Sequence, residues 1–182
     1  MNYSIFVFYY FDLVYVDMTY KSHVFIPDTS FENDDYLIGD FFNFVHNCVV
    51  NERNCDFMSL KNNEEANSYF SLYYEAQVNN GGHSQFIRNS GNNLQLFEAA
   101  ASGLIQIGAR SQEAILRKMI DWALNNQEEA ESLYSRDYRR PDPLNELDEQ
   151  FFDENEVDSI SGRVANWIKQ LPNLKIVSER DF

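Results

Sequence analysis

After residue 34, apolar residues recur along most of the chain at the spacing that places them on one face of an α-helix. The clearest run starts at Asn93, a good N-capping residue, and ends at Gly108, where glycine can adopt the left-handed conformation that closes helices. A second run starts at Ser111, taken here as its N-cap, so the two runs predict an antiparallel helical hairpin. The same spacing predicts further helices over residues 35–48, from residue 62 or 63 to residue 80, and over 128–136, 144–152 and 160–171. On the helix over 144–152, Leu147, Phe151 and Phe152 are expected to point inward.

The beginning of the chain has a different pattern, because residues 3–26 are rich in Tyr, Phe, Val and Ile and favour extended structure. Side chains alternate over 14–19, and a turn at 20–22 toward 23–26 predicts a short β-ribbon; a buried helix stays the alternative. Asp12 and Asp17 interrupt the apolar run and no basic segment precedes it, so we expect neither a signal peptide nor a membrane span.

These patterns predict a mainly α fold, a single-domain bundle of six to eight helices. We assign residues 1–34 to an N-terminal extension with an acidic linker, 35–172 to the helical domain and 173–182 to a loose tail. The small residues at 99–103 predict close packing of one helix against a neighbour.

The most unusual stretch is EAQVNNGGHSQFIRNSG, residues 75–91, which lies between two apolar helical patterns. Gly and Asn tolerate the left-handed backbone, so Gly81 and Gly82 are predicted to end one helix, and Ser84 to cap a short turn after it. Backbone groups at such a joint lack helical partners, and the side-chain amides of Asn79, Asn80, Gln85 and Asn89 are suited to bind them. His83 is expected to be a turn residue with a half-exposed ring.

An alternative reading makes this joint a ligand or catalytic site formed by Glu75, Asn80, His83 and Gln85. Glu75 and Glu98 are the candidate carboxylates for acid–base chemistry with His83, although nothing in their spacing requires them to meet. The chain has no nucleophile elbow, phosphate-binding glycine loop or HExxH pair, so an enzyme is the less favoured reading. A pocket with convergent polar groups would distinguish it from a packed joint.

The string Val78-Asn79-Asn80-Gly81-Gly82, followed by Gln85-Phe86 and Asn89-Ser90, resembles the signature of a bacterial family first described as a domain of unknown function. Its best-known member is a DNA-mimic protein. Ile107-Gly108-Ala109 is also similar to that family's pattern, and the resemblance covers roughly residues 59–124, more weakly through Phe152. Members often carry an acidic residue where this chain has Gln77 and an aromatic residue where it has His83.

The charge is strongly acidic, with a formal net charge of −15 over 182 residues. Residues 1–74 carry a net −8 and 127–182 a net −7, whereas 75–126 are neutral. Such a field repels nucleic acid and anionic membranes and attracts basic partners. We therefore expect no direct binding of nucleic acid and no membrane association.

Carboxylates are densest between residues 142 and 158, and displayed along helices they can imitate the regular negative charge of a duplex. We predict that this stretch forms a partner-binding acidic surface made of Asp142, Glu146, Asp148, Glu149, Asp153, Glu154, Glu156 and Asp158. The resemblance implies that the partner is a basic DNA-binding protein, such as a transcription regulator or nucleoid protein. Arg136, Arg139 and Arg140 are expected to pair with neighbouring acids.

Neither a cofactor nor a metal site is expected. Residues 153–159 begin like a calcium loop but lack its glycine and later ligands. Cys48 and Cys55 have no histidine pair at zinc spacing and are interpreted as reduced, in a cytoplasmic protein. Monomer and homodimer both stay open.

Overall fold

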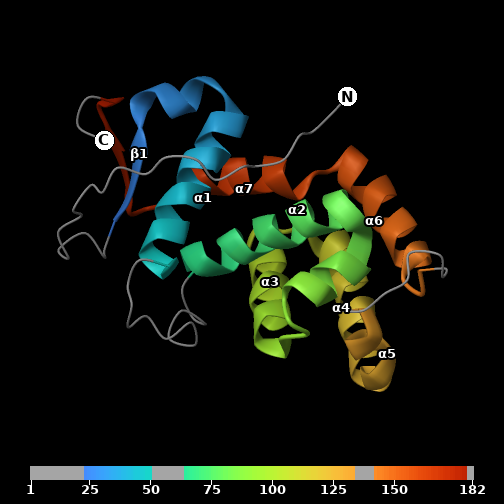
Figure 1. Cartoon of the computed structure of the whole chain (residues 1–182). Helices are drawn as coiled ribbons and strands as arrows, with labels where there is room; N and C mark the ends of the chain where they lie inside the picture. Colours follow the sequence, from blue (N-terminus) through green and yellow to red (C-terminus); the bar gives the residue numbers. More distant parts are fainter. Residues whose placement is uncertain (1–22, 51–63, 134–141, 180–182) are drawn as a thin grey trace.

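A computed structural model describes residues 23–50, 64–133 and 142–179 (Figure 1). Its described part contains seven α-helices and two short strands, which confirms the mainly α fold. The helices are α1 (Asp34–Val50), α2 (Glu64–Asn89), α3 (Leu94–Gln106), α4 (Arg110–Asn125), α5 (Gln127–Ser132), α6 (Asn145–Val157) and α7 (Ile160–Ile168). The strands are β1 (Val24–Pro27) and β2 (Leu174–Val177), and a 3-10 turn over Asp28–Glu32 links β1 to α1.

The centre of the fold is α2, which contacts α1, α3, α5, α6 and α7. Its closest neighbour is α3, because Gly103 of α3 lies against the backbone of α2. A Cβ atom at Gly103 would lie 2.1 Å from the carbonyl oxygen of Asn67, so only glycine fits there. Ala100 and Ala101 are fully buried beside it, which confirms the close packing predicted from the small residues.

The predicted hairpin of α3 and α4 is confirmed, with one cap corrected. Asn93 caps α3 by accepting from the backbone N–H groups of Gln95 and Leu96. Gly108 has φ +78° and donates to Ile105, while the next N–H donates to Leu104, the paired bonds that close many helices. The prediction that Ser111 caps α4 is wrong: α4 begins at Arg110, and no side chain caps it.

The two strands form a parallel pair in which Val24 lies opposite Leu174 and Ile26 opposite Ile176 (Figure 1). The expectation of a loose tail is therefore wrong for residues 174–177. Strand 24–27 pairs with a segment about 150 residues away, so its long-range partner could not be read from a local pattern. The predicted partner strand over 14–19 lies outside the described residues.

Several predicted boundaries shift. α1 begins at Asp34 because Asn33 accepts from the N–H of Asp35, the residue expected to be the cap. α6 continues to Val157, five residues beyond its predicted end, and Phe152 on it is exposed where it was expected to point inward. α5 ends at Ser132. Three further expectations concern parts of the chain outside the described residues. They are the helix cap at 62 or 63, the ion pairs of the three arginines at 136–140 and the state of the two cysteine side chains.

Candidate functional site

The Gly81–Gly82 pair kinks α2 where the sequence predicted that a helix would end. Gly81 has φ −169° and Gly82 has φ +72° with ψ −178°, while helical backbone continues on both sides. The conformation of Gly82 is essentially restricted to glycine. A Cβ at Gly82 would also lie 2.3 Å from Oδ2 of Asp148 on α6. The kink therefore allows α6 to approach the backbone of α2.

His83 follows the kink and joins α2 to α6 through a buried hydrogen-bond network. Its backbone N–H donates to Oδ1 of Asp148 at 2.8 Å, and its Nδ1 lies 2.6 Å from the same oxygen. Its Nε2 lies 2.8 Å from the hydroxyl oxygen of Tyr74. A carboxylate can only accept, so Nδ1–H donates to Asp148, while Nε2 and the Tyr74 hydroxyl form the second hydrogen bond.

The exposed fraction of His83 is 0%, so the prediction of a half-exposed ring is wrong. Burial, together with the nearby charge of Asp148, raises the pKa of the Tyr74 hydroxyl well above its ordinary value. That hydroxyl therefore keeps its proton and can donate to the ring. Because this network is closed and buried, His83 cannot reach a substrate. Its role is to hold α6 against α2 at the joint.

A second contact beside this network holds the segment that leads into α6. The hydroxyl of Ser84 donates to Oδ1 of Asp142 at 2.7 Å, and the N–H of Leu144 donates to the same oxygen at 2.9 Å. Asp142 is therefore half-buried and engaged with α2. The expected capping role of Ser84 is replaced by a contact to a residue 58 positions away.

The amide groups predicted to staple the joint are only partly used. Gln85 and Asn89 both donate to the side-chain oxygen of Gln77, at 3.2 Å and 2.7 Å. Asn79 and Asn80 are exposed, and neither side chain makes a hydrogen bond within the described part of the chain. The staple therefore centres on Gln77, which the sequence reasoning did not select.

Glu75 is buried at the corner between α6 and α7. Asn155 donates to its Oε1 at 2.8 Å, and the first residues of α7, Ile160 and Ser161, also hydrogen-bond to the carboxyl group. Burial raises the pKa of Glu75 above its ordinary value, and these hydrogen bonds act in the opposite direction. Glu75 thus anchors α7, and its surroundings differ from those of His83.

The four residues of the alternative ligand site face different partners. Glu75 binds Asn155, His83 binds Tyr74 and Asp148, Gln85 binds Gln77, and Asn80 is exposed. Glu98 forms an ion pair with Arg117, 2.6 Å away, and takes no part in the joint. None of these contacts supports acid–base chemistry at the joint.

The acidic stretch divides into inward and outward carboxylates. Asp148 is 9% exposed and bound to His83, Asp142 is bound to Ser84, and Asp158 forms an ion pair with Arg163. Asp148 therefore does not belong to a surface. The remaining members are exposed on α6, and we call them the acidic face: Glu146, Glu149, Asp153, Glu154 and Glu156.

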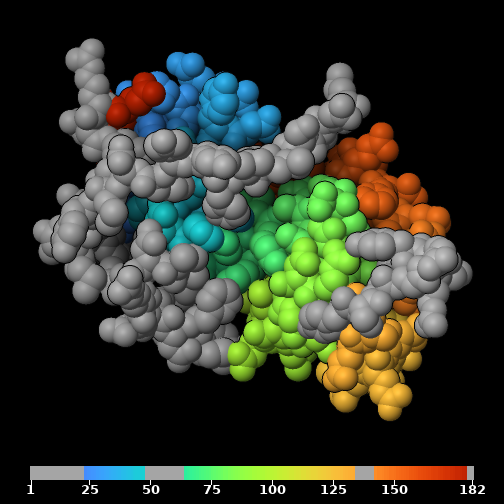
Figure 2. Space-filling view, in the orientation of Figure 1, coloured from blue at the N-terminus to red at the C-terminus, as the bar shows by residue number. Residues whose placement is uncertain are grey.

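The acidic face is not neutralised by cations from the described part of the chain. Within the described residues, the side chains of Glu146, Asp153, Glu154 and Glu156 make no ion pair or hydrogen bond, and Glu149 accepts only from Asn145. Asp34 of α1, by contrast, pairs with Lys169. Asp121 of α4 and Glu128 and Glu129 of α5 are also exposed without an ion pair within the described residues, but they are not lined up along one helix as the carboxylates of α6 are. Figure 2 shows α6 along one edge of the molecule, at the end opposite β1.

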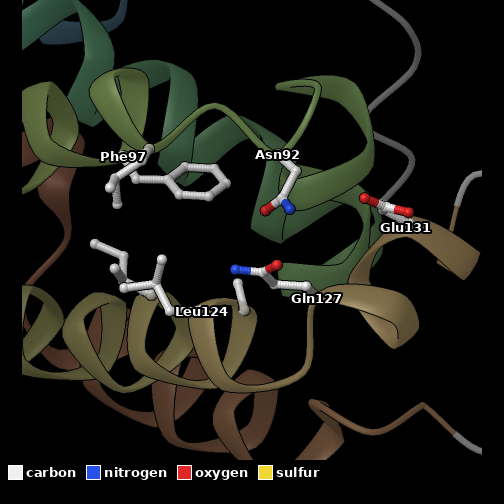
Figure 3. Close-up of a pocket in the computed structure, with 8 residues that line it drawn as sticks. Asn92, Phe97, Leu124, Gln127 and Glu131 are labelled. Carbon is white, nitrogen blue, oxygen red and sulfur yellow. The ribbon is translucent and has the colours of Figure 1, made fainter.

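A separate pocket of about 220 Å³ lies between α3, α4 and α5 (Figure 3). The amide groups of Asn92 and Gln127 point toward each other, with Phe97 and Leu124 to one side and Glu131 farther away. The other lining residues are Leu94, Ile120 and Ala123. Its volume suits one side chain rather than a cofactor, and none of the residues expected to bind a ligand lines it.

A comparison with known protein families identifies the family of this chain. A family model described as DMP19-like protein matches residues 60–171, more than half of the chain. The chain belongs to the DMP19-like family. No curated protein and no solved structure matches it.

The DMP19-like match spans α2 to α7, and so contains the kink, the buried network and the acidic face. The strands and α1 lie outside it. Within the described residues, no three His, Cys, Asp or Glu side chains are grouped as metal ligands would be. Among the described residues of this DMP19-like protein, no helix is long and apolar enough to cross a membrane.

Proposed function

We propose that this protein is an acidic interaction protein whose α6 occupies the DNA-binding surface of a basic protein in place of duplex DNA. The observation that carries the proposal is the row of exposed carboxylates on α6, which have no cationic partner among the residues that the structure describes. Glu146, Glu149, Asp153 and Glu156 recur at intervals of three and four residues, which keeps them on one face of the helix. Membership of the DMP19-like family supports the same reading.

The spacing of these charges is comparable to that of a nucleic acid strand. Intervals of three and four residues correspond to a rise of about 5 Å along the helix axis. One strand of B-DNA carries a charge roughly every 3.4 Å of axis. A basic surface that binds consecutive phosphates would therefore meet carboxylates at similar intervals over about 15 Å of α6.

Buried contacts hold α6 in place before any partner binds. Asp148 is bound by His83 at one turn of the helix, and Asn155 is bound to Glu75 two turns later. Asp142 is fixed by Ser84 just before the helix begins. A surface held rigid in its binding geometry loses less conformational entropy on association.

The partner that fits this surface is a DNA-binding protein such as a transcription regulator or nucleoid protein, which would place the protein in the bacterial cytoplasm. The net charge of −15 would attract such a partner and repel nucleic acid itself. A ligand site at Glu75, Asn80, His83 and Gln85 is not favoured, because these residues are bound to separate partners or exposed.

The test is capture of basic DNA-binding proteins from a bacterial lysate, with release by salt and by added duplex DNA. The informative variant carries four isosteric changes on α6: Glu146→Gln, Glu149→Gln, Asp153→Asn and Glu156→Gln. Asp148 is left intact because its neutralisation would disturb the buried network. We expect binding of the captured protein to weaken at least about tenfold, which is roughly 1.4 kcal/mol.

A matched control removes the same charge from another surface through Asp121→Asn, Glu128→Gln, Glu129→Gln and Glu131→Gln, all exposed on α4 and α5. Loss of binding in the α6 variant alone supports the proposal. Equal loss in both variants would show that net charge, rather than α6, attracts the partner. Unchanged binding in the α6 variant, or capture that duplex DNA does not compete with, would refute it.

A further inference from the structure

An exposed aromatic ring lies beside the acidic face of α6. Phe152 is 44% exposed, and its ring meets that of the buried Phe151 edge-on with centroids 6.0 Å apart. On a helix, residues three and four positions apart are neighbours, so Glu149 and Glu156 lie on either side of Phe152 along the axis. The three side chains form one continuous strip.

Imitation of phosphate charge alone does not require this ring. Single exposed apolar residues are common on protein surfaces and carry little meaning alone. Phe152 differs because both of its neighbours along the strip are carboxylates; Glu156 has no partner in the described chain and Glu149 accepts only from an amide. The strip therefore offers an aromatic face and two acceptors to the same incoming group.

We propose that Phe152 is a stacking position for an arginine of the partner, whose guanidinium lies over the ring while it donates to Glu149 or Glu156. This inference rests on the proposed function, because it takes the partner to bind through α6. Arginine fits better than lysine, since its planar guanidinium stacks on aromatic faces and presents a fork of donors that matches a carboxylate. The proposal therefore requires that the basic surface of the partner contains at least one arginine.

Charge complementarity selects this occupant over an apolar side chain. A partner residue that reaches Phe152 must come close to two carboxylates, and an apolar group there would desolvate them without compensation. A guanidinium neutralises the carboxylate charge as it covers the ring. An apolar contact at Phe152 is the competing outcome in the experiment below.

The probes are hexa-arginine and hexa-lysine peptides, which carry equal charge, titrated into the full chain by calorimetry. The variants are Phe152→Ala, Phe152→Leu and Phe152→Trp, with Tyr36→Leu as the control because Tyr36 is an exposed aromatic on α1. We expect the native protein to prefer hexa-arginine. In Phe152→Ala and Phe152→Leu this preference should fall roughly two- to fivefold, and in Phe152→Trp it should persist.

Each other result overturns the inference. An unchanged arginine preference in all Phe152 variants would exclude stacking at this position. A preference kept by Phe152→Leu but lost in Phe152→Ala would indicate an apolar contact. An equal effect of Tyr36→Leu would show that any exposed aromatic suffices. Thermal melting of each variant separates these results from loss of folding, and the conservative Leu and Trp changes keep the test decisive.

Failure of this inference can be told apart from failure of the proposed function. The variant with four amides on α6 should weaken both peptides and reduce the dependence of affinity on salt. If it does so while the Phe152 variants behave as the native protein, only the arginine site is rejected. If the four amides change neither peptide's affinity, the acidic face itself is rejected.

Discussion

Two features of the structure at position 82 require glycine. Its φ of +72° with ψ near 180° is a backbone conformation that side chains disfavour, and Asp148 occupies the space where a Cβ would lie. Gly81 differs, because its φ of −169° is ordinary extended backbone and its neighbour is the flexible side chain of Gln85. The two adjacent glycines should therefore respond differently to the same change.

We predict that Gly82→Ala lowers the free energy of unfolding by about 2 kcal/mol or more, and that Gly81→Ala lowers it by less than about 1 kcal/mol. The difference arises because alanine at 82 strains the backbone and displaces the carboxylate that binds His83. Urea unfolding followed by circular dichroism measures both values. Equal stability of the two variants would show that the kink does not depend on Gly82.

At this scale the sequence predicted which residues are unusual but not what they contact. The Gly pair and its neighbours were identified correctly as a special backbone site. The burial of His83 was missed because its partner Asp148 lies 65 residues away and belongs to a stretch that reads as uniformly acidic. Only a tertiary contact distinguishes Asp148 from Asp153, since both are aspartates on the same helix.

Between whole elements, the corner between α6 and α7 depends on the buried carboxyl of Glu75. The folded state raises its pKa above 4.5, so the folded protein holds this proton more tightly than the unfolded chain does. The stabilising contribution is present below the unfolded pKa and is lost as pH rises through the folded pKa. Ionisation of Glu75 therefore destabilises the folded state, and the hydrogen bonds from Asn155 and α7 offset this destabilisation only in part.

We predict that Glu75→Gln changes the pH dependence of stability more than its overall level. The variant cannot ionise at this site, so its melting temperature relative to the native protein should rise as pH increases from 4.5 toward 7. Glu113→Gln, at a carboxyl outside this corner, is the control. Parallel curves for Glu75→Gln and the native protein would show that burial does not perturb this carboxyl.

Elements defined by local signals were predicted well. α3 has an Asn cap, an apolar face and a closing glycine within 16 residues, and its bounds agree closely with the prediction. α6 was predicted to end at Phe152, where the inward apolar pattern stops, whereas the helix continues to Val157 and both Phe152 and Val157 are exposed. The exposure of Phe152 gives the acidic face its aromatic neighbour, so the helix that the local pattern predicted least well is the one proposed to bind a partner.

For the molecule as a whole, the parallel pair of β1 and β2 joins residues near the two ends of the described chain. β1 buries Val24 and Ile26, and β2 contributes Leu174 to the same core. Asn173, the residue before β2, also donates to Glu65 of α2 at 2.8 Å. Removal of β2 would leave the backbone of β1 without its partner and expose apolar surface beneath it.

We therefore predict that deletion of residues 173–182 lowers stability by at least about 2 kcal/mol, the scale of one apolar side chain returned to water. For a protein of this size this corresponds to a fall in Tm of roughly 4–8 °C. The matched control deletes only residues 178–182 and keeps β2, so its Tm should stay close to that of the full chain. Because α6 is anchored to α2 and lies at the opposite end of the molecule, the longer deletion should leave the peptide affinities of the acidic face unchanged below its Tm. Loss of those affinities together with β2 would mean that the two ends of the fold are coupled and that α6 is not held by its local anchors alone.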